Sequence, residues 1–388
     1  MSRNKAPETI AAANGIGGDT AFGAVTPPIY LSSTYTFETF GRARTYDYGR
    51  SGNPTRDVLA ETLARLEGGE GAVVVSAGMA AIDLTLGCLT PGDLIVAPHD
   101  CYAGTWRLLT ARQAKGQFGV MFIDLGDEAA LLSALARGPK LVLIESPSNP
   151  LMRVVDIRKI AAQAKAVGAR VIVDNTFLSP ALQQPIKLGA DLVVHSTTKF
   201  LNGHSDVVGG AVITATRADA DELVAWANTI GVTGSPFDSY LTLRGVRTLF
   251  VRVERQQKTA GAIADFLLHH PAVTAVHYPG LPSHPSHEIA KAQQDGFGAM
   301  LSFEVAGGVE GVRRFVGAIE IFTLAESLGG IESLVAHPAT MTHASMSPEV
   351  RAAAGIKDSL LRLSVGLESE TDLLADLASG LEAVTKGL

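Results

Sequence analysis

Six short runs of consecutive apolar residues lie between residues 72 and 194, and helical stretches separate most of them. The runs occupy residues 72–75, 94–97, 120–123, 141–144, 171–173 and 192–194. Strands that are covered by helices on both faces are apolar at every position, whereas strands with one exposed face alternate. The pattern therefore predicts an α/β fold in which helices cover both faces of a mostly parallel sheet.

The segments on either side of this repeat have a different character. Residues 1–55 are irregular and rich in glycine, threonine, proline, serine and tyrosine, which predicts an N-terminal arm that packs on another surface, such as a neighbouring subunit. Residues 56–255 then form the α/β domain. After about residue 255 the strands and helices no longer alternate regularly, so residues 256–388 predict a smaller α+β domain.

Within these domains, individual elements can be assigned from periodicity and stop signals. A helix is predicted at 56–66, because apolar residues share one face and Gly68-Gly69 follows. A second helix begins at Met79. In the C-terminal part the pattern predicts strands and a last helix at residues 273–278, 299–305, 361–365 and 371–384.

Composition excludes several classes of protein. The 388 residues carry a net charge of −7, and the basic residues are scattered, so neither nucleic acid nor an anionic membrane is an expected partner. The two cysteines, Cys88 and Cys101, fit a reducing compartment. Residues 1–8 lack the apolar core of a signal peptide, and no apolar run approaches the ~20 residues of a membrane span. We expect a soluble cytoplasmic protein.

Lys199 and Asp174 each follow one of the apolar runs. Lys199 comes after Ser196-Thr197-Thr198 at the end of run 192–194, and Asp174 ends run 171–173. A lysine amine, a carboxylate and nearby hydroxyls are the groups that hold pyridoxal phosphate: the amine forms a Schiff base, the carboxylate keeps the pyridine nitrogen protonated, and the hydroxyls bind phosphate. Taken alone, Lys199 would be a surface lysine and Asp174 a turn cap. Their joint place at the carboxyl ends of parallel strands, where ligands bind, favours the functional interpretation.

Three further positions are candidates for binding anions. Gly78 and Met79 lie where a strand turns into a helix, and the free N–H groups of a helix start favour phosphate. Tyr48 and Arg50 lie in a glycine-containing loop that could clamp phosphate. Arg362 lies inside a predicted strand, where it is either a solvent-facing residue or a receptor for a carboxylate.

Other chemistries lack their signatures. The turn at residues 76–79 has neither the Gly-Lys-Ser/Thr ending of a Walker loop nor a Gly-x-Gly-x-x-Gly pattern. None of the ten histidines shows the His-x-x-x-His spacing of a metal site, and no Gly-x-Ser-x-Gly elbow is present. We therefore expect no metal. A nucleotide-binding dehydrogenase and a non-catalytic cofactor-binding protein remain as the alternatives from other classes.

The segment around Lys199 resembles the cofactor-lysine signature of the Cys/Met-metabolism family of pyridoxal-phosphate enzymes. The resemblance extends along almost the whole chain and rests on residues 27–35, 97–102, 145–150, 174–180, 191–205 and 322–330, followed by His337 and residues 341–343. It implies the aspartate-aminotransferase-type fold (fold type I), with a mostly parallel seven-stranded sheet. It also implies a homotetramer built from two dimers.

The resemblance further implies roles at the cofactor. Lys199 would form the Schiff base, Asp174 would contact the pyridine nitrogen, and Tyr102 would stack on the ring and assist as an acid–base group. The residues implied to hold the phosphate within one chain are Gly78, Met79, Ser196 and Thr198. Tyr48 and Arg50 would reach the phosphate of the neighbouring subunit.

For the substrate, the resemblance implies γ-replacement on an O-acylhomoserine, with O-succinyl-L-homoserine and L-cysteine as the small-molecule partners. The residues implied to contact substrate are Arg362, Asn149, Glu326, Ser327, Arg107 and Tyr48. Ser51 stands where some related synthases have arginine, so Arg107 is the candidate for the distal acyl group. Elimination from cystathionine and replacement by sulfide are the alternatives within the family.

Overall fold

The computed structural model describes residues 5–344 and 346–387. The first four residues of the predicted arm and the last residue of the predicted C-terminal domain therefore lie outside the described residues. The chain divides into two compact units, and each is built from two stretches of sequence. Unit 1 comprises the described residues up to Leu89 and Arg170–Phe250, and unit 2 comprises Thr90–Ala169 and the described residues from Val251 onward. The domain boundaries near residues 55 and 255 stay a prediction.

The central sheet has seven strands in the order β1-β7-β6-β5-β4-β2-β3. The six predicted strands are present within two residues of the expected ends: β1 (Gly71–Val75), β2 (Leu94–Pro98), β3 (Gly119–Ile123), β4 (Leu141–Glu145), β5 (Arg170–Asp174) and β6 (Leu192–Ser196). The pairs β2–β3, β2–β4 and β5–β6 are parallel, whereas β7 pairs antiparallel with both β1 and β6. The predicted α/β class with a mostly parallel sheet is confirmed.

β7 (Gly210–Thr214) was not predicted from the sequence, and neither were the short strands at Thr323–Leu324 and Leu334–Ala336. Only a helix-free loop joins β7 to β6, so the chain reverses direction instead of crossing over, and the two strands run antiparallel. Gly210 is required at the start of β7, because a Cβ there would lie 2.2 Å from the carbonyl oxygen of Ala77. The close approach brings the turn before α3 against the strand next to β6.

Helix boundaries in unit 1 follow local signals. α2 (Pro54–Glu67) begins at Asn53, whose side chain accepts hydrogen bonds from the backbone N–H groups of Thr55 and Arg56, and it ends at Gly68 with φ of 76°. The other helices of the unit are α3 (Gly78–Thr85), α7 (Ser179–Leu182), α8 (Arg217–Ile230) and α9 (Pro236–Val246), with short 3₁₀ turns at Leu86–Cys88 and Pro185–Leu188.

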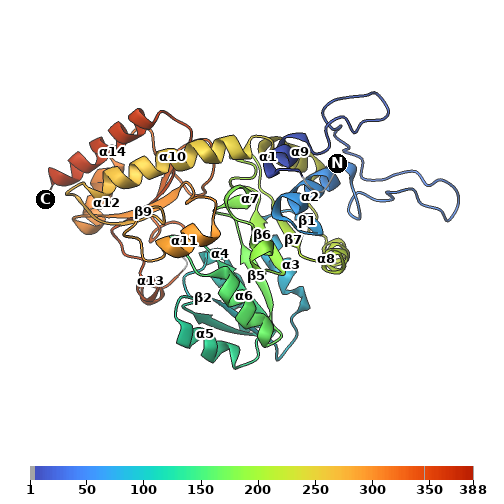
Figure 1. Ribbon diagram of the computed structural model, residues 1–388, viewed down its shortest axis with the longest axis horizontal. Coiled ribbons are helices and arrows are strands. Elements are labelled where there is room, and N and C mark those ends of the chain that lie inside the picture. The colour runs from blue at the N-terminus through green and yellow to red at the C-terminus, as the bar shows by residue number, and fades with distance from the viewer. Residues whose placement is uncertain (1–4, 345, 388) are drawn as a thin grey trace. The chain divides into compact units, whose positions relative to one another are not determined.

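The N-terminal arm is less irregular than its composition suggested. A short helix, α1 (Pro7–Ala13), begins with proline in its first turn and packs on α2. Between these helices the chain forms long loops that extend away from α1 and α2 in Figure 1, with residues 33–35 paired to residues 47–49 through backbone hydrogen bonds. Large apolar side chains on the loops are exposed, including Phe22, Phe37 and Phe40.

Unit 2 contains β2, β3 and β4 and a second, five-stranded sheet with the order β10-β11-β12-β9-β8. The strands of this sheet are β8 (Val273–His277), β9 (Met300–Val305), β10 (Thr323–Leu324), β11 (Leu334–Ala336) and β12 (Leu360–Ser364). The helices of the unit are α4 (Ala103–Ala114), α5 (Glu128–Leu135), α6 (Ile157–Ala166), α10 (Leu249–Leu268, of which the first two residues belong to unit 1), α11 (His287–Gln293), α12 (Gly308–Val316), α13 (Pro348–Ala354) and α14 (Glu370–Thr385). The three predicted C-terminal strands and the last helix are confirmed.

The second sheet is covered by helices that pack on its apolar side chains. Phe303 of β9 and Phe315 of α12 meet edge to face with ring centroids 5.4 Å apart, and α14 packs on α12. No helix in the described part of the chain is both long enough and apolar enough to cross a lipid bilayer.

Candidate functional site

Lys199 lies in a tight turn directly after β6. Its backbone N–H donates to the carbonyl of Ser196 at 3.2 Å, and its own carbonyl accepts from Gly203 at 2.7 Å. The side chain is half-buried. Thr198, the residue directly before Lys199, is fixed by Gly209: its hydroxyl accepts from the Gly209 N–H at 3.0 Å and donates to the Gly209 carbonyl at 3.3 Å. The turn therefore presents the amine from a rigid backbone.

Asp174 ends β5, next to the strand that leads to Lys199. Its Oδ1 accepts from the backbone N–H of Thr176 at 3.0 Å, and the Thr176 hydroxyl in turn accepts from the Ser196 N–H at 3.0 Å. Burial raises the pKa of the Asp174 carboxyl, while the hydrogen bonds from Thr176 and the nearby His195 oppose that rise. A cationic ring nitrogen beside this carboxylate would offset the cost of burying its charge.

The start of α3 is pressed against the end of β6. A Cβ on Gly78 would lie 2.7 Å from the Cβ of Ser196, so only glycine allows this approach. The N-cap residue, Ala77, has no side chain that could cap the helix, and residues 78–80 are only half-buried. The N–H groups of Gly78 and Met79 and the hydroxyl of Ser196 thus form a compact set of donors suited to an anion.

Tyr48 and Arg50 lie together on the arm of unit 1. The Arg50 guanidinium carbon is 5.6 Å from the centroid of the Tyr48 ring, and Nη1 donates to the side-chain oxygen of Asn228 at 2.9 Å and to its backbone carbonyl. Both side chains are exposed. Within one chain this pair therefore contacts α8, and no hydrogen bond among the described residues joins it to the donors at α3 and β6.

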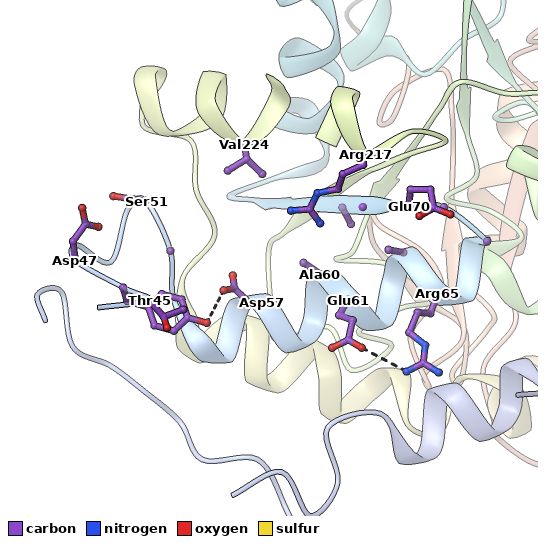
Figure 2. Close-up of a pocket in the computed structure, with 17 residues that line it drawn as sticks. Thr45, Asp47, Ser51, Asp57, Ala60, Glu61, Arg65, Glu70, Arg217 and Val224 are labelled. Atoms are coloured by element: carbon purple, nitrogen blue, oxygen red, sulfur yellow. Dashed lines mark hydrogen bonds and ion pairs between the residues drawn. The ribbon is translucent and has the colours of Figure 1, made fainter. Parts of the chain in front are cut away.

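A groove of about 810 Å³ lies elsewhere in unit 1, between the arm, α2 and α8. Figure 2 shows Arg217 and Val224 projecting from α8, with Asp57 and Glu61 on the facing helix α2. Ser51 is on its rim, but Lys199 and Asp174 do not line it. The groove is therefore separate from the predicted site.

In unit 2, Arg362 lies in the middle of β12, which pairs with β11 on one side and β9 on the other. Its Nη1 donates to Oδ1 of Asn149 at 2.9 Å, and its Nη2 donates to the carbonyl of Ser327 at 2.8 Å. Only 2% of the residue is exposed, so the interpretation as a solvent-facing strand arginine is wrong. The strand is covered on both faces, which leaves no solvent-facing position on it.

The guanidinium of Arg362 is not saturated by its protein partners. Its Nε is buried and has no hydrogen-bond partner among residues 5–344 and 346–387. Burial lowers the pKa of Arg362 to about 10, so the side chain stays charged at neutral pH. A buried cation with a free donor is suited to a carboxylate ligand, which would supply both the missing hydrogen bond and the missing charge.

Glu145, a residue that sequence analysis did not single out, connects two predicted site residues in unit 2. Its Oε2 accepts from the backbone N–H of Tyr102 at 2.9 Å, and its Oε1 accepts from the N–H of Asn149 at 3.0 Å. The carbonyl of Asn149 in turn contacts Nε2 of His343 at 3.0 Å. The backbone of Asn149 is thus held from both sides while its side chain contacts Arg362.

The remaining predicted residues of unit 2 are more accessible. Tyr102 is 39% exposed at the start of α4, and Arg107 is exposed on the same helix. Glu326 is exposed, and Ser327 has a φ of 89°. A serine with positive φ is strained, and such strain persists where surrounding contacts fix the backbone, as the bond from Arg362 to the Ser327 carbonyl does here.

Comparison with known proteins identifies the family. The model of the Cys/Met metabolism PLP-dependent enzymes matches residues 8–382. The chain is 58% identical to cystathionine gamma-synthase of Escherichia coli strain K12 over 388 residues, which cover all of both proteins. This chain belongs to the Cys/Met-metabolism family of pyridoxal-phosphate-dependent enzymes.

Two further comparisons show how broad the family is. The chain is 48% identical over 368 residues to cystathionine beta-lyase of Lactococcus lactis strain MG1363, covering 95% of this chain and 97% of the relative. The crystal structure of cystathionine gamma synthase from Xanthomonas oryzae pv. oryzae, in complex with aminoacrylate and cysteine, matches with a TM-score of 0.98 and 58% identity, covering 99% of this chain and all of that one. The predicted family, fold type and cofactor are confirmed.

The residues of this member of the family fit pyridoxal phosphate. Unit 1 supplies a lysine on a rigid turn, a carboxylate on the adjacent strand end and an uncapped helix start packed on Ser196. These are the amine, the pyridine partner and the anion donors that the cofactor needs. All three could be predicted from the sequence, because each lies at or directly after the end of a strand. Glu145 and His343 were not predicted as site residues, because their contacts are with residues farther away in the sequence.

Proposed function

We propose that this enzyme is a cystathionine gamma-synthase: it replaces the succinyloxy group of O-succinyl-L-homoserine by L-cysteine, forming L-cystathionine and succinate. The observation that carries the proposal is the full-length similarity to a gamma-synthase at 58% identity, with the similar Xanthomonas oryzae enzyme crystallised with cysteine. The beta-lyase relative is less similar, at 48% identity.

In this proposal the cofactor is held by unit 1 and by Tyr102. Lys199 is the covalent anchor, and Asp174 stabilises the protonated pyridine nitrogen. The N–H groups of Gly78 and Met79 and the hydroxyls of Ser196 and Thr198 would donate to the cofactor phosphate, for Thr198 in place of the 3.3 Å bond to the Gly209 carbonyl. Tyr102 stacks on the ring. When bound, pyridoxal phosphate takes up the electron pair that is released at the α-carbon of the substrate.

Lys199 also moves the protons of the reaction. As a free amine, Lys199 would remove the Cα proton, pass that proton on to the bound cofactor and, neutral again, take a proton from Cβ. The bond from Cγ to the succinyloxy oxygen breaks, and succinate leaves. The thiolate of cysteine then forms a bond to Cγ, and protons return to Cβ and Cα. Tyr102 serves as a second acid–base group.

Arg362 and Asn149 bind the α-carboxylate in this proposal. An α-amino acid carries its amino group and carboxylate on one carbon, so the reaction requires that Lys199 and Arg362 act on the same substrate molecule. The other proposed substrate contacts are Glu326, Ser327, Tyr48 and, for the distal succinyl carboxylate, Arg107. Ser51 lacks a cationic group, which leaves Arg107 as the candidate arginine.

A product assay tests the reaction. Purified enzyme with O-succinyl-L-homoserine and L-cysteine should release cystathionine and succinate in equal amounts. Cystathionine offered as the substrate should be cleaved far more slowly. Rapid cleavage to homocysteine and pyruvate would identify a beta-lyase, and rapid cleavage to cysteine and 2-oxobutanoate would identify a gamma-lyase. A preference for sulfide over cysteine would identify a sulfhydrylase.

We further propose a cytoplasmic homotetramer, built from two dimers in which each active site is shared. The exposed apolar side chains of the arm support burial against another chain. Tyr48 and Arg50 would then contact the phosphate held at α3 of the partner subunit, where a second positive group is needed to balance a dianion. Breaking its two hydrogen bonds to Asn228 would release Arg50 for this contact.

Complementation tests the shared site. Arg50→Ala chains and Lys199→Ala chains are each expected to be inactive. After subunit exchange, a mixed dimer has one site with both defects and one site with neither. Random exchange makes half of the dimers mixed, so activity should return to at most roughly a quarter of wild type. If tagged heterodimers are detected by mass and no activity returns, Arg50 serves its own chain.

A further inference from the structure

Glu67 occupies a position that disfavours a carboxylate in two ways. It is the last residue of α2, where the helix dipole is negative, and its exposed fraction is 0%. Oε1 contacts His195 Nε2 at 2.6 Å and accepts from Nδ2 of Asn175 at 2.8 Å. Oε2 has no hydrogen-bond partner among the described residues. A charge kept at such a place needs compensation, and these two residues supply it.

The two partners of Glu67 lie next to the residues proposed to hold the cofactor. Asn175 follows Asp174 on the β5 side, and His195 precedes Ser196 on β6. Because side chains alternate between the two faces of a strand, Asn175 and His195 point to the face opposite that of Asp174 and Ser196. Oε1 of Glu67 thus connects the ends of β5 and β6 on the face of the sheet opposite Asp174 and Ser196.

The rest of this buried cluster keeps the arrangement in one geometry. Asn175 and Gln183 exchange hydrogen bonds: Nε2 of Gln183 donates to Oδ1 of Asn175 at 3.0 Å, and Nδ2 of Asn175 donates to the carbonyl of Gln183 at 2.8 Å. His195 is 1% exposed, and its Nδ1 has no hydrogen-bond partner in the described chain. Glu67 from α2 contacts its ring, and Asp174 from β5 interacts with it electrostatically.

We propose that Glu67 and His195 are positioning residues for the cofactor. The pair lies on the face of the sheet opposite Asp174, where it fixes the ends of β5 and β6. It thereby keeps the Asp174 carboxylate ionised and directed at the pyridine nitrogen. The electrostatic part is consistent with the pKa of Asp174, which burial raises and His195 opposes. The inference rests on the role of Asp174 in the proposed function. It is tested by the affinity of the apo-enzyme for pyridoxal phosphate, which is measured without any substrate.

The experiment compares binding of pyridoxal phosphate to apo-enzyme variants. Glu67→Gln keeps the shape and the oxygen acceptor but removes the charge. We expect its dissociation constant for pyridoxal phosphate to rise about tenfold, comparable to the loss of a supporting partner at a metal ligand. The stability of the apo-protein should be unchanged or higher, because a buried charge at a helix C-terminus has been removed. A purely structural role would instead lower stability and leave cofactor binding intact.

Asp191→Asn provides a matched control. Asp191 joins the same two strands at their opposite ends, where its Oδ2 accepts from the Val171 N–H at 2.8 Å. This variant should lose stability and bind pyridoxal phosphate as wild type does. His195→Gln is the second test of the pair, because an amide still donates to Glu67 but cannot carry charge. It should weaken cofactor binding like Glu67→Gln.

A double-mutant cycle with Asp174→Asn decides whether the effect passes through Asp174. In that background, Glu67→Gln should change the dissociation constant less than twofold, since its effect no longer has a target. An undiminished tenfold effect, or wild-type binding by the single Glu67→Gln variant, overturns the inference. A wrong product in the turnover assay would overturn the proposed function and leave these binding constants untouched.

Discussion

The two units prepare their candidate site residues in different ways. In unit 1, Lys199, Asp174 and Gly78 stand at strand ends and at a helix start, half-buried, with backbone N–H groups as the main donors. In unit 2, a fully buried Arg362 is held by Asn149 and Ser327. Geometry that any parallel sheet provides suffices for the first. The second depends on particular side chains that keep a charge out of water.

Each unit also contains a buried carboxylate that connects two segments of the chain, and the two carboxylates have different partners. Glu67 contacts two side chains, His195 and Asn175, whereas Glu145 accepts from two backbone N–H groups. A bond to backbone fixes the position of a loop whatever residues it carries. A bond to an ionisable side chain also adds charge near the site. In unit 1, Glu67 therefore both holds the strand ends and adds charge near the site. In unit 2, Glu145 holds the backbone, and the charge near the site comes from a different residue, Arg362.

The largest effect is expected in unit 1. Lys199→Ala removes both the covalent anchor and the base, so turnover should fall by several orders of magnitude. The purified wild-type protein should be yellow, with an absorbance band that borohydride removes, and the variant should lose this band. An active variant that is insensitive to borohydride would show that another residue holds the cofactor.

A large effect of a different kind is expected in unit 2. Arg362→Ala should weaken capture of the amino acid by ~3–5 kcal/mol, seen mainly as a higher KM, because a desolvated charge pair is lost. The cofactor absorbance should be unchanged. Arg252→Ala is the control: Arg252 is also buried, with a pKa lowered to about 10 by burial, but lies on α10. Unchanged kinetics in the Arg362 variant would make it a structural arginine.

A smaller effect tests the carboxylate that joins the loops of unit 2. In Glu145→Gln one oxygen accepts a single N–H, and the new amide opposes the other, at a cost of ~1–3 kcal/mol. We expect kcat/KM to fall about tenfold, in line with this cost. Asp376→Asn is a matched control, since Asp376 accepts from the backbone of residues 320–322. Equal stability losses with equal activity losses would contradict a specific role of Glu145.

The smallest effect concerns pH and His343. Burial and the nearby Arg362 lower the pKa of His343 from 6.5 to about 4. The unfolded chain therefore binds more protons than the folded chain between these values, and stability falls as the pH drops through this window. The contribution of His343 to this loss of unfolding free energy should reach ~2 kcal/mol by pH 5.

Measuring the free energy of unfolding at several pH values tests this contribution of His343. His343→Gln, which can still donate to the Asn149 carbonyl, should lose less stability between pH 7.5 and pH 5 than wild type does. The same substitution at His269, an exposed residue, should leave the pH dependence unchanged. An identical slope for wild type and His343→Gln would show that the pKa of His343 is the same in the folded chain as in the unfolded chain.

The sequence by itself determined six strands of the central sheet, three strands of the second sheet, the ends of α2 and α14, and the residues proposed for the cofactor. Short continuous apolar runs that alternate with helical stretches favour strands covered on both faces, and polar residues that follow such strands gather at the carboxyl edge of a parallel sheet. Lys199, Asp174 and Gly78 were found for this reason. Asn53 and Gly68 likewise set the ends of α2 through local backbone chemistry.

Only the tertiary structure decided which polar residues are buried and paired. Glu67 ends an ordinary helix, Glu145 ends an ordinary strand, and Arg362 stands in a strand that could have faced water. The residues that pair with these side chains lie far away along the chain: His195 is 128 residues from Glu67, and Asn149 is 213 residues from Arg362. The direction of β7 also depended on the loop before it. Local patterns report backbone preference and hydrophobicity, whereas the fate of a buried charge depends on what the fold brings against it.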